Sequence, residues 1–313
     1  MLAYATRRIL TTIPVMLFVA LFVFSLLYIA PGDPAAIIAG DQATAADIAR
    51  IRVSLGLDRP FVVRFGDWLW QVLHGNLGTS IFTNLPVTHM IAQRLQPTVA
   101  LMVLTLLISV SVAIPMGVVA AWKQGSLIDR VVMGLAVFGF STPVFVVGYL
   151  LAYVFALKLG WLPVQGFTSI DRGLWPFLRT LILPSVALAL IYIALIARIT
   201  RATMLEVLSQ DYVRTARAKG VGQRDILFVH ALKNAAVPIV TVVGLGVASL
   251  IGGVVVTETV FAIPGLGRLT VDAILQRDYP VIQGIVLMFS FVYVIINLVV
   301  DLLYTLFDPR IRY

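Results

Sequence analysis

Residues Ile9–Ala30 read ILTTIPVMLFVALFVFSLLYIA, a run of 22 residues without a charged side chain. At 1.5 Å of rise per residue, a helix of this length crosses the hydrocarbon core of a bilayer. Arg7 and Arg8 precede it, as in a signal peptide, but signal peptides have apolar regions of about 7–15 residues and end at a small-residue cleavage site. This run ends in Pro31-Gly32-Asp33-Pro34. We therefore interpret it as a retained transmembrane helix.

The rest of the chain has the same apolar character. Its 313 residues are 60% hydrophobic and 12% charged, with a mean hydropathy of +1.00, whereas soluble domains average about 45–50% apolar and about 25% charged residues. The long apolar runs do not alternate as the strands of a β-barrel would. The sequence predicts an all-α polytopic membrane protein with six transmembrane helices, at 9–30, 98–121, 131–157, 181–203, 236–260 and 282–306.

The basic residues indicate an orientation. A net charge of +8 would suggest nucleic-acid binding in a soluble protein, but in a membrane protein Lys and Arg mark cytoplasmic loops. With the N-terminus inside, 13 of the 23 Lys and Arg residues lie inside. Five of the other ten fall in segment 31–97, and loops of this length translocate largely regardless of charge. We expect both termini to be cytoplasmic and no nucleic-acid partner.

The predicted spans divide the chain into four parts. These are residues 1–30, with the N-terminus and helix 1; 31–97, an external helical subdomain; 98–306, the helical core, including a cytoplasmic loop at 204–235; and 307–313, a cytoplasmic tail.

Two amphipathic helices are expected in the external subdomain. Thr44-Ala45-Ala46-Asp47 resembles a capping box and precedes Ile48, Ile51 and Leu55 at helical spacing. Phe61, Phe65, Trp68 and Val72 form a second apolar stripe. An aromatic helix face of this kind can lie in the membrane interface, pack on a partner, or cap the ends of the bundle.

No pattern of catalytic residues occurs. The chain has no cysteine, its three histidines are isolated, and it lacks a P-loop and a G-x-S-x-G elbow. Gly265-Leu266-Gly267 lacks the third glycine of a dinucleotide fingerprint. We expect a protein that is not an enzyme and that binds no metal or cofactor itself. Glu258 and Asp301 lie near span ends rather than at the midplane, where secondary transporters bind their coupling ions, which argues against that class.

The most polar segment is the loop 204–235, which contains DYVRTARAKG at Asp211–Gly220. Its pattern predicts a helix, a glycine break and a second short helix, with Gln210, Arg214 and Arg217 on one face. Small residues at Ala216, Ala218 and Gly220 permit close approach by another surface. We interpret the loop as a docking element for a cytoplasmic partner; the alternative is a solvated basic loop attracted to anionic lipid.

This loop resembles the EAA loop of ABC importer permeases, in a divergent form. Arg214, Thr215 and Ala216 fall on the Glu-Ala-Ala of that family, and Gly220 falls on its glycine. Further on, His230 and Leu232 stand at its Ile and Leu, and Lys233 replaces its proline.

Other blocks extend the likeness along the chain to the B-type permease subunits of dipeptide, oligopeptide and glutathione importers. In order they are APGDP (Ala30–Pro34), LGLDRP (Leu55–Pro60), GNLGTS (Gly75–Ser80), DYVRTARAKG (Asp211–Gly220), VFAIPGLGRL (Val260–Leu269), RDYPVIQG (Arg277–Gly284) and DPRIRY (Asp308–Tyr313).

The resemblance implies a type I ABC importer permease fold in the bacterial cytoplasmic (inner) membrane. The chain would form half of a translocation pathway, as a heterodimer with a C-type permease. Two ABC ATPases, which would hold the ATP and Mg, and an extracytoplasmic peptide-binding protein would complete the transporter. The coupling helix would comprise Arg214, Thr215, Ala216, Arg217, Ala218, Lys219 and Gly220.

Hydroxyl groups within the predicted spans are candidates for the substrate pathway: Ser109, Ser111, Ser141, Thr142 and Tyr192. Hydroxyls also join helices to one another. Three alternatives remain at this point: a nickel permease of the same family, a stand-alone channel or secondary carrier, and a purely structural assembly subunit.

Overall fold

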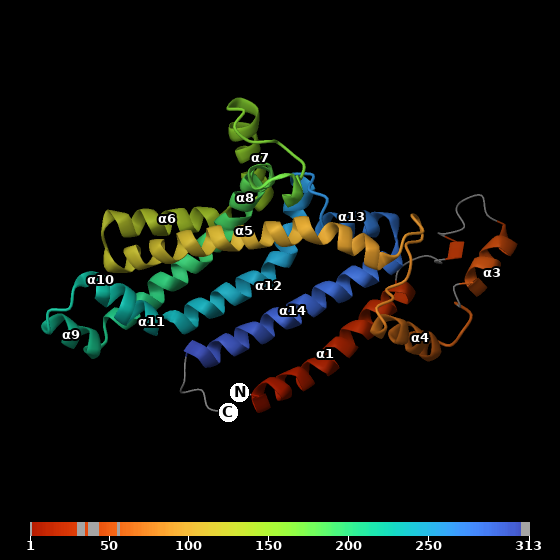
Figure 1. The fold of residues 1–313 in the computed structure, drawn as a ribbon, viewed down its shortest axis with the longest axis horizontal. Coiled ribbons are helices and arrows are strands. Elements are labelled where there is room, and N and C mark those ends of the chain that lie inside the picture. Colours follow the sequence, from red (N-terminus) through yellow and green to blue (C-terminus); the bar gives the residue numbers. More distant parts are fainter. Residues whose placement is uncertain (1, 30–34, 37–43, 55–56, 308–313) are drawn as a thin grey trace. The chain divides into compact units, whose positions relative to one another are not determined.

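The computed structural model describes residues 2–29, 35–36, 44–54 and 57–307 (Figure 1). Within this part every regular element is helical, and the one β-type pairing is the isolated bridge between Thr79 and Pro86. The blocks Ala30–Pro34 and Asp308–Tyr313, and Leu55, lie outside the described residues. The elements are α1 (Leu2–Ile29), α3 (Ala45–Ser54), α4 (Phe61–Leu73), α5 (Val87–Trp122), α6 (Leu127–Ser141), α7 (Val144–Leu151), η1 (Ala152–Lys158), η2 (Ile170–Arg172), α8 (Leu174–Leu208), α9 (Asp211–Ala218), α10 (Gln223–Asp225), η3 (Ile226–Ala231), α11 (Leu232–Asn234), α12 (Ala236–Val260), α13 (Leu266–Gln276) and α14 (Tyr279–Phe307).

Five helices of the described chain are long and apolar enough to span a membrane: α1, α5, α8, α12 and α14. They match five of the six predicted windows, although α5 and α8 each begin several residues before the expected start. The sixth window, 131–157, is not one helix. It is a pair, α6 followed by α7 and η1, with a bend of 104° between them.

Proline explains this break. Thr142 adopts an extended backbone, with φ −92° and ψ 124°, and Pro143 is the N-cap residue of α7. A proline disfavours helical geometry in the residue before it and donates no backbone hydrogen bond. The prediction of one continuous helix over 131–157 is therefore wrong at this point. By contrast, α5 continues through Pro97 and Pro115 as one helix.

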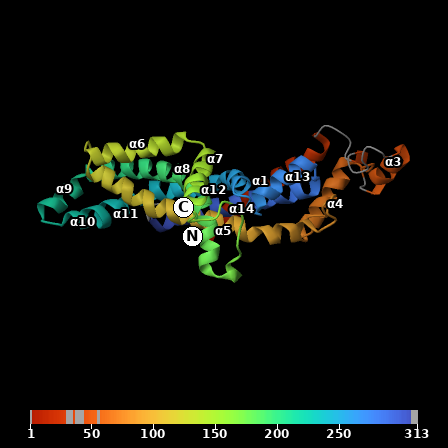
Figure 2. The same ribbon diagram turned by 90° about the horizontal axis from the view of Figure 1, so that it is seen from above.

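The chain divides into two compact units, and the larger is built mainly from Leu95–Arg268. Its central element is α8, against which α6, α7 and α12 pack, as Figure 1 and Figure 2 show for α6 along α8. Over its most apolar window α8 is 61% buried, more than any other described span. Its fully buried side chains include Leu181, Leu188 and Ile196. This burial explains why α8 is apolar on nearly all sides.

The second unit comprises Thr6–Arg94 and Leu269–Val294. The two helices predicted there are present, as α3 and α4. The amide of Ile48 donates to the Thr44 carbonyl at the start of α3. In α4, Phe65 and Trp68 pack against α1, with ring centroids 5.5 Å and 5.2 Å from that of Phe24. The aromatic face of α4 therefore covers α1 of the same chain.

Within this unit a buried carboxylate joins two of the sequence blocks. The Ser80 hydroxyl donates to Asp278 Oδ2 at 2.5 Å, and the Ile81 amide donates to Asp278 Oδ1 at 3.3 Å. Ser80 ends the block GNLGTS and Asp278 lies in RDYPVIQG. Both residues are buried, and buried polar groups need hydrogen-bond partners. The Ser80 hydroxyl and the Asp278 carboxylate meet this need for each other.

Candidate functional site

The predicted docking loop forms a helix, a glycine turn and a second helical stretch, as the sequence indicated. After α8 ends at Leu208, the chain turns into α9, passes Gly220 and Gly222, and returns through α10, η3 and α11 to α12. The η3 segment is a π-helical turn, a feature often found at functional sites.

Gly220 makes the turn possible. Its φ is +81°, in the left-handed region that favours glycine. The amide of Val221 donates to the Ala216 carbonyl at 3.1 Å, and the Gly220 amide donates to the Arg217 carbonyl at 3.0 Å. These two bonds form a Schellman motif at the end of α9. Gly220 therefore ends the helix and directs the chain back toward α12.

The helix α9 has one buried face. Val213 and Ala216 are buried, and α9 packs on η3, where Ile226 and Leu227 are also buried. Ala216 thus packs on its own chain, whereas the sequence analysis placed it among the small residues that a partner would approach. The reason is helical spacing, because a residue three positions after Val213 shares its face.

The remaining predicted coupling residues lie on the outer face. Arg214, Arg217, Ala218, Lys219 and Gly220 are exposed. Thr215 is also exposed, but its hydroxyl donates to the Asp211 carbonyl at 3.0 Å. Arg214 lies 3.6 Å from Asp211, with both side chains exposed, so this ion pair holds the arginine only weakly.

The docking loop also exposes the side chains of Tyr212, Phe228 and Val229. Sequence reasoning did not identify Tyr212 and Phe228 as part of this surface. Partial burial raises the pKa of the Tyr212 phenol, which also forms a hydrogen bond with Asn234. The tyrosine is therefore neutral near pH 7 and links α9 to α11. A surface that combines basic groups with exposed aromatic and aliphatic groups is typical of protein interfaces.

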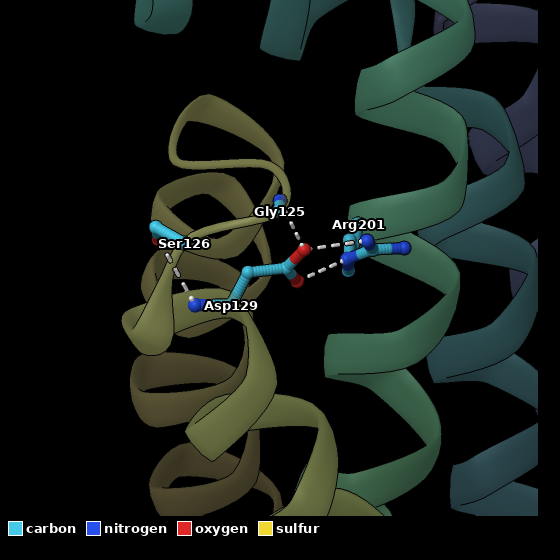
Figure 3. A network of polar contacts seen from close by, with 4 residues as sticks. All are labelled: Gly125, Ser126, Asp129 and Arg201. Carbon is cyan, nitrogen blue, oxygen red and sulfur yellow. Dashed lines mark hydrogen bonds and ion pairs between the residues drawn. The ribbon is translucent and has the colours of Figure 1, made fainter.

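A buried ion pair holds α8 shortly before the loop (Figure 3). Arg201 Nε lies 2.5 Å from Asp129 Oδ1, and Arg201 Nη2 lies 2.7 Å from Oδ2. The Gly125 amide donates to Oδ2 at 2.9 Å, and the Asp129 amide donates to the Ser126 hydroxyl that caps α6. The side chains of Asp129 and Arg201 are 6% and 25% exposed. The pair ties the α5–α6 turn to α8, two turns before α8 ends at Leu208.

Two of the candidate pathway hydroxyls act within the helix packing. Ser109 is buried on α5, where its hydroxyl lies 2.7 Å from the Thr105 carbonyl and 3.4 Å from the Ala189 carbonyl of α8. Tyr192 is buried on α8, and its hydroxyl accepts a hydrogen bond from Ser249 of α12 at 3.3 Å.

The other three candidates lie elsewhere. Ser111 is exposed on α5. Ser141 and Thr142 stand at the break between α6 and α7, where the Thr142 hydroxyl donates to the Phe138 carbonyl at 2.8 Å. The described contacts do not gather the five residues into one cluster, and their role in a pathway stays a prediction.

Glu258 has a structural role that the sequence analysis did not foresee. The carboxylate is fully buried. The Thr98 hydroxyl donates to Glu258 Oε1 at 2.5 Å, and the Arg268 amide, in the first turn of α13, donates to Oε2 at 3.0 Å. Thr98 in turn accepts from the Leu266 amide at 2.8 Å. A carboxylate at this helix start satisfies backbone donors and complements the helix dipole.

The glycines of PGLG leave room for this carboxylate. A Cβ added at Gly265 would lie 2.1 Å from Glu258 Oε1, and one added at Gly267 would lie 2.5 Å from the Val255 Cα. Gly265-Leu266-Gly267, which has no dinucleotide role, therefore allows the loop to fold over a buried acid.

Glu258→Gln is expected to destabilise the protein by about 1–3 kcal/mol, the usual cost of leaving a buried donor unsatisfied. The Thr98 proton already points to Oε1, so the new amide group would face either that proton or the Arg268 N–H. Thermal unfolding in detergent measures the loss. The exposed Glu206→Gln is the control, expected within about 0.5 kcal/mol of the parent. Equal stability of the two variants would contradict the network.

Comparison with known proteins gives matches over nearly the entire chain. The family described as "Binding-protein-dependent transport system inner membrane component" matches residues 113–313, and the family of the corresponding N-terminal part matches residues 1–102.

Individual relatives match from end to end. A probable peptide ABC transporter permease protein of Sinorhizobium fredii is 56% identical over 310 residues, covering 99% of each chain. A glutathione transport system permease protein of Salmonella choleraesuis is 45% identical over 313 residues, and a dipeptide transport system permease protein of Alkalihalophilus pseudofirmus is 42% identical over 333 residues; both cover 100% of each chain.

Among solved structures, the inward-facing MetNI methionine ABC transporter matches with a TM-score of 0.59. The match covers 70% of this chain and 96% of that chain at 16% identity, and it bears on the fold alone. The predicted helical permease fold is confirmed.

Proposed function

This chain belongs to the family of binding-protein-dependent transport system inner membrane components, and from that membership we propose that it is a permease subunit of an ATP-driven importer for short peptides. The observation that carries the substrate class is the end-to-end similarity to relatives named for peptide, dipeptide and glutathione transport. Glutathione is itself a tripeptide, so the three names describe one chemical class.

The α9 surface is where we place ATPase docking. Its outer face presents Arg214, Arg217 and Lys219, and the same loop exposes Tyr212 on α9 and Phe228 on η3. Its inner face packs on η3, so a force applied to α9 reaches α12 through η3 and α11. The ion pair of Asp129 with Arg201 fixes the other end of the loop, on α8. A change in the ATPases would thereby move α8 and α12 together, as a rigid-body or hinge transition requires.

The remaining parts of the transporter follow from the family. A homologous C-type permease would complete the pathway as the other half of a heterodimer. Two ATPase subunits would bind ATP and Mg on the cytoplasmic side, where the loop and both termini would lie. A binding protein would deliver peptide from outside the bacterial inner membrane. The distribution of Lys and Arg supports this orientation.

Co-purification tests this function. The chain is isolated from native membranes in mild detergent, and mass spectrometry identifies the proteins that accompany it. We expect a second permease and P-loop ATPases, and the reconstituted assembly with its binding protein should accumulate a labelled dipeptide only when ATP is present. Glutathione and a nickel chelate are assayed in parallel. A chain that purifies alone and moves solute without ATP would refute the importer, whereas uptake of nickel alone would refute the substrate class.

A further inference from the structure

The helix α4 has more apolar surface than its contact with α1 uses. Its face toward α1 carries Phe61, Phe65 and Trp68. A second apolar arc, next to that face, is exposed: Val62 is 76% exposed, Trp70 65% and Leu73 72%. Polar side chains are confined to a third, narrower arc with Arg64, Asp67 and Gln71.

The contacts of α4 place it beside a membrane span. The Phe61 ring lies 5.1 Å from the Tyr28 ring and 5.4 Å from the Phe24 ring, measured between centroids. Arg64 donates a hydrogen bond to the Tyr28 hydroxyl and lies over the Tyr28 ring. Tyr28 and Phe24 belong to the last two turns of α1, whose apolar span covers Leu10–Ile29.

The same packing gives the depth of α4. Its residues Phe65, Trp68, Leu69 and Val72 join a cluster with Ala20 and Val23 of α1 and Leu287 of α14. At 1.5 Å per residue, Ala20 lies about 14 Å below the end of the α1 span at Ile29. Leu287 lies about 12 Å inside the α14 span, which begins at Tyr279. Two separate spans therefore place α4 within the depth of one leaflet.

We propose that α4 is an interfacial membrane helix, with Val62, Trp70 and Leu73 inserted among lipid acyl chains and the arc of Asp67 and Gln71 directed to the headgroups and water. At this depth, exposed apolar side chains meet hydrocarbon, and a Trp is favoured at its boundary. Asp67 pairs with Arg59 at 2.8 Å, and both side chains are about half exposed, as residues at a polar surface would be. The span that α4 packs against also exposes large apolar side chains, Phe18 and Phe22.

Single cysteines test the inserted arc, because the chain has none of its own. Val62→Cys and Leu73→Cys are compared with the matched controls Asp67→Cys and Gln71→Cys on the same helix. Each is spin-labelled in the transporter reconstituted into phosphatidylcholine vesicles with the subunits that co-purify. Collisions with oxygen, which concentrates in hydrocarbon, are measured against collisions with a water-soluble nickel complex.

We expect oxygen collisions to exceed nickel collisions at positions 62 and 73, and the order to reverse at 67 and 71. Dominant nickel collisions at 62 and 73 would place the arc in water and overturn the proposal. Suppression of both reagents there would mean that a protein partner covers the arc, which would also overturn it.

Tryptophan fluorescence provides a second test that needs no label. Brominated phosphatidylcholine quenches a Trp in contact with acyl chains, so quenching should fall in Trp70→Phe relative to the parent chain. Unchanged fractional quenching would show that Trp70 does not meet lipid. Neither test depends on which solute the transporter carries, so both stand apart from the proposed function.

Discussion

Gly220→Glu is expected to reduce ATP-driven uptake by about 100-fold while the chain still inserts in the membrane in normal amounts. The substitution places an acidic side chain beside Arg214, Arg217 and Lys219, at the end of the surface that we assign to ATPase docking. A loss of about 2–3 kcal/mol of binding free energy, as for an interface hot spot, corresponds to about 100-fold, because each 1.4 kcal/mol is a factor of ten. Uptake into vesicles and the amount of ATPase retained on them measure the effect.

A matched control separates docking from backbone strain. Gly160 also has a left-handed backbone, with φ +66°, and like Gly220 it has no atom within 4 Å of an added Cβ. Gly160→Glu therefore introduces the same strain, about 1–2 kcal/mol, and the same charge outside the docking loop. We expect it to retain uptake, and Gly220→Asn to retain most of it, because Asn tolerates this conformation. Full uptake in Gly220→Glu would reject the coupling assignment.

Arg201→Met is expected to lower the free energy of unfolding by about 3 kcal/mol. The change leaves the Asp129 carboxylate buried without its bidentate partner, and breaking a buried pair in this way costs about 3–5 kcal/mol. We expect the lower end of this range of free-energy cost, because a quarter of the Arg201 side chain is exposed to solvent. Denaturant-induced unfolding in mixed micelles measures the loss.

Two further variants test whether the lost stability of Arg201→Met comes from the unpaired Asp129 carboxylate. Arg198 lies one turn earlier on α8, and its guanidinium stacks on the Phe140 ring at 5.7 Å. Arg198→Met removes the same charge from an exposed site and should cost about 0.5–1 kcal/mol. The double variant Asp129→Leu with Arg201→Met should recover most of the lost stability, since apolar replacement of a buried pair is often neutral. A double variant as unstable as Arg201→Met would show that the arginine acts through packing rather than charge.

Much of the architecture could be predicted because its signals are local. The run of apolar residues in Ile9–Ala30 is sufficient to specify a membrane helix, since only a backbone bonded within itself is stable in hydrocarbon. The spacing of Phe61, Phe65 and Trp68 predicted α4, and Gly220 predicted the turn after α9. Each of these signals lies within a few turns of helix, where periodicity and backbone preference act.

Other features depend on residues that are distant in the chain, and no local pattern contains them. Asp129 and Arg201 are 72 positions apart, and Thr98 and Glu258 are 160 apart. Ala216 is buried because α9 packs on η3, a segment that lies beyond the glycine turn of the loop.

The sequence by itself therefore determined that this is a helical membrane protein, where most of its spans lie, and that a helix–glycine–helix loop joins two of them. Only the tertiary structure decided that the third window breaks by 104°, that the acid Glu258 holds the start of α13, and that α4 packs on α1 while a second apolar arc of α4 stays exposed. The physical reason is range: hydrophobicity and helix propensity are properties of neighbouring residues, whereas burial and pairing are properties of surfaces that meet only in the folded chain.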